Sequence, residues 1–425
     1  MNAEPPVVPP DLASHDAVVI VGGGIVGLSA AVELARRGHE TVVIDRGEIG
    51  TGCAIGSAGH IVPSHVVPLA APGMLRTLRR ELGRRQRALS VAWTASPSFW
   101  AWAVDFLRHC RADLSDSAVP ALDALGRLSA DLTRDFAAEV DIEYVDDGLL
   151  DVYGSAEAFE HAGARADELR GHGVQAHTLD AAATRRLEPA VNDSVVGAIH
   201  FPDDGSVRPA SLLEALQDRA RDAGVTLVPS TQVTGLHRDA SIVTAVATDG
   251  GNIPARHVVI AAGAWSGSFA DELDERLPVV GARGLSLTVD RPSEGPGRAM
   301  LLGEQHVAVA PYRDELRMSG WFELGTWSLT PDPRRIERLE ALARSRLDFD
   351  DTLTDRRSWA GLRPMTPDGV PIIGPSGRWS NVTIATGHAM TGLSMGLGTG
   401  RLVAQLVDDE PTDIDVDRFT VARFA

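Results

Sequence analysis

Near the start of the chain, a run of β-branched residues passes directly into a glycine-rich turn. Val18–Val21 precedes three glycines at G-x-G-x-x-G spacing, Gly22, Gly24 and Gly27, and an Ala- and Leu-rich stretch follows. A second apolar run ends at Asp45. In such a strand–turn–helix unit, backbone N–H groups at the helix N-terminus bind a pyrophosphate, and the acid after the second strand accepts hydrogen bonds from a ribose. The unit predicts a dinucleotide-binding site on a parallel α/β sheet.

Size and charge restrict what surrounds this unit. The chain has 425 residues, which exceeds what one hydrophobic core usually serves, so we expect two domains. Its formal net charge of -18 disfavours binding to nucleic acid or to an anionic membrane, because both need a basic surface. All 40 of the Lys+Arg residues are arginine, so no lysine is available for catalysis.

Two cysteines, Cys53 and Cys110, are too few for a disulfide framework or a metal cluster, and they fit a reducing compartment. We expect both to be buried thiols and expect no metal. Residues 1–15 are Pro-rich and lack the basic and apolar regions of a signal peptide, which predicts a disordered arm. Together these features predict a cytoplasmic protein.

Further along, the pattern alternates between helix and strand. Helical periodicity runs from about residue 72 to 140. This region contains an aromatic cluster formed by Trp93, Phe99, Trp100, Trp102 and Phe106. Such a cluster is typical of packing, and contact with a membrane or a quinone is the alternative. Strands are predicted at 143–153, 174–179, 225–228, 232–237, 258–266, 279–289 and 306–321. Helices are predicted up to residue 170 and at 211–223, 333–347 and within 386–407.

Five stretches in a fixed order carry a resemblance to a known family. They are Gly22–Gly27 with Asp45, then 56–59, 258–266, 361–374 and 387–392. In this order the chain resembles the D-amino-acid oxidase superfamily of FAD enzymes, most closely its bacterial D-amino-acid dehydrogenase branch. The resemblance implies an α/β fold with a Rossmann-type FAD-binding domain (16–90, 200–277 and 358–425). It also implies an inserted α+β substrate domain with a mixed sheet (91–199 and 278–357).

The same resemblance assigns residues to the cofactor. The implied FAD contacts are Gly22, Gly24, Ile25, Val26, Gly27, Asp45, Arg46, Gly56, Ser57, Ala58, Gly59, Val233, Ala262, Gly263, Trp265, Gly361, Arg363, Gly387, Thr391, Gly392, Leu393 and Ser394. The dehydrogenase branch usually has Asn where this chain has Ser57, so one hydrogen bond to flavin or substrate is expected to differ. Related oxidases attach FAD through a cysteine near the Arg363 motif. Because no cysteine follows Cys110, we expect noncovalent FAD.

Substrate-binding residues follow from chemistry and resemblance together. Arg363 is the preferred clamp for a substrate carboxylate, since guanidinium gives paired hydrogen bonds to a planar anion, and Arg283 is the second candidate. His60 and His388 are candidates for contacting or orienting the amine, with a structural role as the alternative for each. Tyr312 is expected in the pocket wall, together with Trp321.

These residues predict an FAD-dependent dehydrogenase that oxidises a D-amino acid or a cyclic secondary amino acid. Hydride transfer from Cα to flavin N5 would give an imine and then a 2-oxo acid, and the electrons would pass to a quinone or another acceptor. An oxygen-dependent amine oxidase of the sarcosine or glycine oxidase type is an alternative, which the missing lysine disfavours. A noncatalytic flavoprotein subunit is another. Weak peripheral membrane contact and the oligomeric state stay open.

Overall fold

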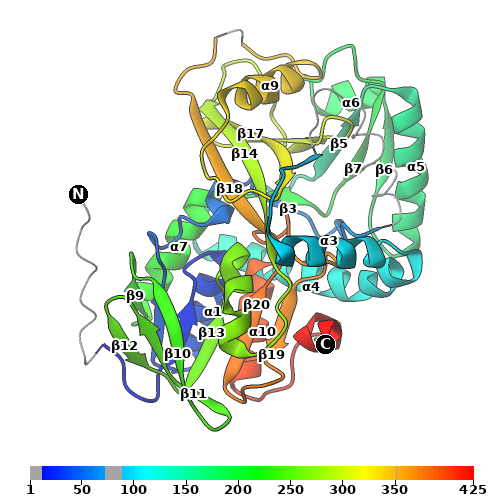
Figure 1. Cartoon of the computed structure of the whole chain (residues 1–425). Coiled ribbons are helices and arrows are strands. Elements are labelled where there is room, and N and C mark those ends of the chain that lie inside the picture. Colours follow the sequence, from blue (N-terminus) through cyan, green and yellow to red (C-terminus); the bar gives the residue numbers. More distant parts are fainter. Residues whose placement is uncertain (1–11, 72–88, 351) are drawn as a thin grey trace.

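Two large β-sheets organise the chain, which a computed structural model describes over residues 12–71, 89–350 and 352–425 (Figure 1). The first sheet has six strands in the order β19-β20-β13-β1-β2-β9. Their bounds are β1 Val18–Val21, β2 Thr41–Ile44, β9 Thr226–Val228, β13 His257–Ile260, β19 Ile372–Pro375 and β20 Val382–Thr386. Only the β19–β20 pair is antiparallel, so this is the mostly parallel sheet that the glycine motif predicts.

Both faces of the six-stranded sheet are covered. Three helices pack on one face: α1 (Ile25–Arg36), α7 (Pro209–Asp222) and α10 (Gly396–Val407). A three-stranded antiparallel sheet packs on the other face, built from β10 (Val233–Asp239), β11 (Ile242–Thr248) and β12 (Gly251–Pro254). Burial on both faces explains why these strands are continuous apolar runs, and the Rossmann-type α/β expectation is confirmed.

The second sheet has nine strands, lies above the first in Figure 1, and follows the order β18-β14-β17-β16-β15-β5-β7-β6, with β4 beside β17. Their bounds are β4 Leu89–Val91, β5 Leu149–Tyr153, β6 His177–Asp180, β7 Gly197–Phe201, β14 Val280–Asp290, β15 Met300–Leu302, β16 Val307–Pro311, β17 Glu315–Leu324 and β18 Arg357–Met365. Parallel and antiparallel pairs both occur, as expected for a mixed substrate-domain sheet. Strand β18 pairs with β14 along its length, so it belongs to this nine-stranded sheet. The sequence prediction instead assigns residues from 358 onward to the FAD-binding domain.

The remaining elements cover this sheet or join the two units. Helix α9 packs on the apolar face of β14, β16 and β17, while α5 and α6 lie by β5–β7. Helix α4 packs on α10 of the first unit, and the two-residue strands β3 and β8 pair with each other. The bounds are α3 Pro97–His109, α4 Ala112–Glu139, α5 Ala156–Gly171, α6 Ala181–Leu187, α8 Ala270–Leu273, α9 Pro333–Arg344, β3 His60–Ile61 and β8 Gly205–Ser206.

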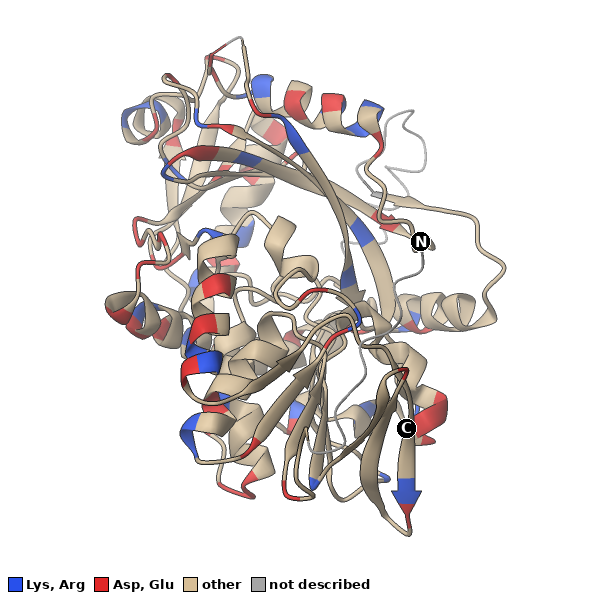
Figure 2. Ribbon diagram, turned by 90° about the vertical axis from the view of Figure 1, so that its left-hand side faces the viewer, with Lys and Arg blue, Asp and Glu red and all other residues tan. Residues whose placement is uncertain are grey.

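The sequence predictions for 72–140 and 1–15 fall partly outside the described residues, which omit 72–88 and 1–11. Within the described part, the aromatic cluster divides. Trp102 is buried against Phe106 in a stacked pair, whereas Trp93 is 86% exposed. Within the residues that the structure describes, no helix combines the length and the hydropathy of a transmembrane segment. Acidic and basic residues are interleaved over both units (Figure 2).

Candidate active site

A cavity of about 1260 Å³ lies between the two large sheets. The glycine motif and the loop after β2 form one part of its wall, and the carboxyl ends of β13 and β20 contribute further residues. The substrate-side wall comes from strands of the nine-stranded sheet. Ligands bind outside the carboxyl ends of parallel strands in open α/β folds, so this is the expected location for a dinucleotide.

The three motif glycines have distinct structural roles. Gly22 has φ +114°, and a Cβ there would lie 2.3 Å from Ala261 O. A Cβ on Gly27 would lie 1.9 Å from Gly22 O, so glycine at this position allows α1 to pack closely against the turn. Gly27 itself does not line the cavity. Gly24 has no atom within 4 Å of such a Cβ, leaving open space at the amino end of α1. Since the first N–H groups of α1 have no intrahelical partners, this end fits a pyrophosphate.

Beyond the turn, the residues expected near the adenosine end line the cavity. The two oxygens of Asp45 accept hydrogen bonds from the N–H groups of Gly23 and Gly47, each at 2.8 Å, which fixes the carboxylate at the cavity wall. The Arg46 guanidinium lies 3.7 Å from the centre of the Trp265 ring. Val233 lines the same region, so the side chains present fit a bound nucleoside.

The small-residue loop after β2 is tied to the nine-stranded sheet by Arg317. Its Nη1 donates to Ile55 O at 2.6 Å and to Ser57 O at 3.0 Å. The loop also approaches Trp359 so closely that a Cβ on Gly56 would lie 2.1 Å from the indole ring. Neither Arg317 nor Trp359 was predicted as a site residue, because nothing in the local sequence shows which strands face this loop.

The segment after β20 closes the cavity from the other side. Gly387 has φ +83° and makes the turn, while Ser394 Oγ accepts from Val62 N at 2.9 Å; neither lines the cavity. Gly392 and Leu393 do line it, and their N–H groups donate to no other residue in the described part of the chain. Free amides at a cavity wall fit the expected contact with a flavin ring, whose reduced form carries negative charge.

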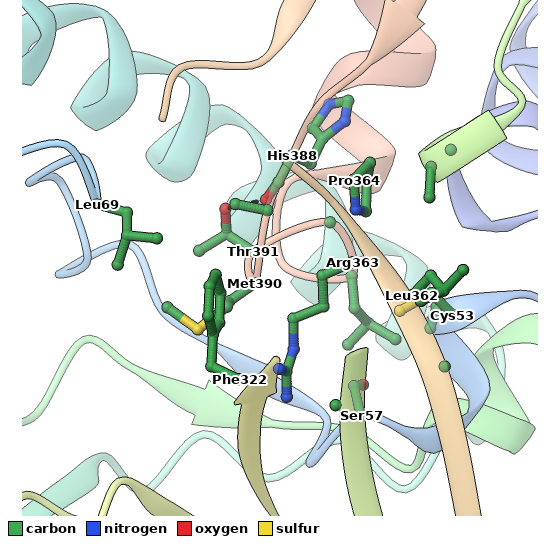
Figure 3. Close-up of a pocket in the computed structure, with 18 of the residues that line it drawn as sticks. Cys53, Ser57, Leu69, Phe322, Leu362, Arg363, Pro364, His388, Met390 and Thr391 are labelled. Atoms are coloured by element: carbon green, nitrogen blue, oxygen red, sulfur yellow. Dashed lines mark hydrogen bonds between the residues drawn. The ribbon is translucent and has the colours of Figure 1, made fainter. Parts of the chain in front are cut away.

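Arg363 extends from β18 into the cavity between Phe322 and Ser57 (Figure 3). Its Nη1 donates to Trp321 O at 2.6 Å, and the guanidinium carbon lies 6.0 Å from the Phe322 ring centre. Burial lowers the pKa of Arg363, and no carboxylate of the described residues offsets this effect. A desolvated cation with free N–H groups is suited to a planar anion such as a carboxylate.

A β-bulge shapes the space around this arginine. The β14–β17 register shifts between Arg283 and Leu285, and Trp321 on β17 adopts φ +67°, which is strained for a bulky side chain. The bulge turns the Trp321 carbonyl toward Arg363. On β14, a Cβ at Gly284 would lie 2.4 Å from the guanidinium carbon, so a larger residue there would displace the guanidinium from this position.

Both candidate histidines line the cavity and are neutral near pH 7, since burial lowers the pKa of each to about 4. His60 Nε2 lies 3.4 Å from Val309 O, an acceptor, so Nε2 carries the proton and Nδ1 is an acceptor. His388 Nε2 lies 2.9 Å from Thr399 Oγ1, whose own proton goes to Met395 O. Its Nδ1 is therefore also an acceptor.

Two predicted substrate residues lie away from the cavity. The Arg283 side chain pairs with Glu323, which also binds Arg335, so its charge is already neutralised. Tyr312 packs under the flavin loop beside Ala58, and burial raises its pKa to about 12. The structure therefore does not bring either of them to the site, whereas Arg363, His60, His388 and Trp321 all line the cavity.

Sequence reasoning missed several polar lining residues. Cys53 was expected to be buried, but it is partly exposed at the cavity wall beside Arg363, while Cys110 is buried as expected. His65, Asp151 and Arg165 line a second part of the cavity. No local motif marks them, and they come from a loop, a strand and a helix that only the fold brings together.

Comparisons with known proteins agree with this arrangement. A family model described as FAD dependent oxidoreductase (DAO) matches residues 17–406. A D-amino acid dehydrogenase from Paramagnetospirillum magneticum is 33% identical over 96% of this chain and 98% of its own length. A D-amino acid dehydrogenase from Helicobacter pylori is 27% identical over 96% of this chain and 98% of its own length. The solved glycine oxidase of Geobacillus kaustophilus has TM-score 0.75 and 24% identity, covering 96% of this chain and 98% of its own. L-Proline dehydrogenase from P. horikoshii has TM-score 0.72 and 20% identity, covering 96% and 97%.

Proposed function

The chain belongs to the DAO family of FAD-dependent oxidoreductases, and from this premise we propose that it is a dehydrogenase that oxidises a D-amino acid to an imine. Water would hydrolyse the imine to a 2-oxo acid and ammonia, or a cyclic imine would be released. FAD, when bound, supplies the two-electron sink for this oxidation. The observation that carries the proposal is Arg363, a desolvated guanidinium that extends into the cavity without a carboxylate partner in the described part of the chain.

In this proposal, Arg363 binds the substrate carboxylate through paired hydrogen bonds. Trp321 O holds one N–H of the guanidinium, and Gly284 leaves room for it, so the clamp is oriented before substrate arrives. His60 presents Nδ1 as a neutral acceptor, which suits an N–H of the substrate amine. Near pH 7 His60 carries its single proton on Nε2 and no positive charge, so the amine would bind in its neutral form beside Nδ1.

The cofactor would be held by the elements whose geometry fits it. The amino end of α1 would bind the pyrophosphate and Asp45 the ribose, while Gly392 and Leu393 would offer N–H groups to the flavin ring. We propose that the attachment is noncovalent, because no cysteine follows Cys110. The D configuration is supported by the names of the curated relatives.

We further propose that the electrons pass to a quinone-type acceptor in preference to oxygen. The chain contains no lysine, the residue expected to activate oxygen in sarcosine-oxidase relatives. The test is steady-state turnover of the holoenzyme on D-amino acids, once with a quinone analogue and once with air alone. Turnover with the quinone should greatly exceed peroxide formation. Equal rates would favour an oxidase, and no reaction with either acceptor would favour a noncatalytic flavoprotein subunit.

A further inference from the structure

The cavity continues past Arg363 and His60 under the far strands of the nine-stranded sheet. One row of paired residues crosses this sheet, running from Ser319 on β17 through Ala308 on β16 and Leu301 on β15 to Asp151 on β5. All four line the cavity. Neighbouring strands lie about 4.8 Å apart, so three steps place β5 about 14 Å across the sheet from β17. Arg363 Nη1 is anchored on β17, at Trp321 O.

Asp151 has an unsatisfied oxygen at the far end of this row. Its Oδ1 is buried and has no hydrogen-bond partner among the described residues. Burial raises the pKa of Asp151 to about 7, and the charge of Arg165 partly opposes this shift. A buried carboxylate oxygen without a donor is costly, so a donor supplied by a ligand would relieve that cost.

The groups around Asp151 favour a cationic donor over an anion. A second carboxylate, Asp204, lies nearby and accepts from Ser64 Oγ at 2.6 Å and from Ser64 N at 3.1 Å. His65 is neutral, because burial lowers its pKa to about 4. Arg165 is the cation facing these groups, and it is exposed on α5, where it can be solvated by water.

The walls between the two ends are largely apolar. Leu301 on the sheet and three apolar residues of α5, Ala162, Ala166 and Leu169, all line the cavity. A ligand that reaches Asp151 from the Arg363 end therefore needs an apolar stem and a polar tip. Arginine and lysine side chains have this form, with three or four methylene groups before the cation.

We infer that this lobe binds the side chain of the substrate and that Asp151 binds its cationic tip, which makes a D-amino acid with a long basic side chain the preferred substrate. The inference rests on the proposed function, because Arg363 must hold the carboxylate at the other end. Asp151 is therefore a specificity-determining residue. It would set which side chain is accepted and leave the oxidation of the α-amine to the groups near His60.

The test compares three D-amino acids of similar length in the holoenzyme: D-arginine, the uncharged D-citrulline and the apolar D-norleucine. The readout is the substrate concentration needed for half-maximal anaerobic flavin bleaching. A hydrogen bond to a charged group corresponds to about 10- to 100-fold in affinity. D-Arginine should therefore reach half-maximal bleaching at a concentration lower by about that factor than either of the other two. Asp151→Asn should remove the advantage and leave D-norleucine unchanged. Asp203→Asn is the matched control, since Asp203 is exposed and does not line the cavity.

A second readout does not depend on turnover. 5-Guanidinopentanoate has the carboxylate and guanidinium but no α-amine, so it should perturb the flavin spectrum at lower concentration than hexanoate, and Asp151→Asn should abolish the difference. If D-norleucine bleaches the flavin but D-arginine has no advantage, or keeps it in Asp151→Asn, the side-chain inference is overturned and the proposed function stands. If no D-amino acid bleaches the flavin, the proposed function fails. The guanidinopentanoate comparison then decides the Asp151 site alone.

Discussion

Truncating Arg363 should separate substrate capture from cofactor binding. The guanidinium keeps one hydrogen bond to Trp321 O, so its remaining N–H groups are free for a substrate carboxylate. Removing one partner of a desolvated charge pair costs about 2–5 kcal/mol. At about 1.4 kcal/mol for each tenfold, Arg363→Ala should weaken substrate binding by roughly two to three powers of ten. Arg363→Lys should recover only part of this loss, because an ammonium makes no paired contact.

The assay is the rate of anaerobic flavin reduction against substrate concentration, with FAD content checked by absorbance. Arg283→Ala is the matched control, since its side chain is engaged by Glu323 outside the cavity. That variant should keep the substrate affinity but lose about 1–3 kcal/mol of unfolding free energy, because Glu323 loses a charged hydrogen bond. Arg363→Ala should lose little stability, since the charge it removes is unpaired in the described part of the chain. Wild-type saturation behaviour in Arg363→Ala would refute the clamp.

Three further outcomes follow from the structure. Gly284→Ala should displace the Arg363 guanidinium and weaken substrate binding without loss of FAD. Gly281→Ala should have a smaller effect on substrate binding, because its added Cβ would first meet Leu362 at 3.4 Å. Flavin-reduction titrations of both variants check this. Acid precipitation should release the flavin into the supernatant, and a yellow pellet would contradict noncovalent binding. The pKa of His388 is about 4 when folded and 6.5 when unfolded, so its contribution to stability is complete above pH 6.5 and is lost as the pH falls toward 4. His388→Gln should therefore reduce the slope of the unfolding free energy against pH in that window by up to about 1.4 kcal/mol per pH unit. Denaturant titrations at several pH values measure this slope. An unchanged slope would contradict a neutral, buried His388.

The dinucleotide-binding unit could be predicted because its residues are adjacent along the chain. The strand, the three glycines and the acid occupy Val18–Asp45, and each acts through its local backbone or its immediate neighbours. Most strands and helices also lie close to where periodicity placed them; for example, α7 spans Pro209–Asp222 and β14 spans Val280–Asp290. The predicted contacts of individual residues with FAD stay predictions.

The substrate side could be predicted only in part, because the sequence does not show which strands are neighbours. Arg363 lies opposite Ala282 in the β14–β18 register, so Arg283, the next residue, points to the other face of the sheet. The sequence alone does not distinguish these two arginines. Asp151 was missed for the same reason, since its place in the cavity depends on the β5–β15 pairing.

The proposed function requires that a D-amino acid binds in the cavity beside Arg363 by its carboxylate and is oxidised there. The most direct test is stopped-flow reduction of the holoenzyme flavin, without oxygen, by the best D-amino acid of a screen, by its L-enantiomer and by the corresponding decarboxylated amine. We predict rapid bleaching by the D-amino acid, and bleaching slower by at least about two powers of ten with the amine, because it lacks the group that Arg363 binds. Equal bleaching by the amine and the acid would contradict the carboxylate clamp, and faster bleaching by the L-enantiomer would contradict the D-amino acid assignment.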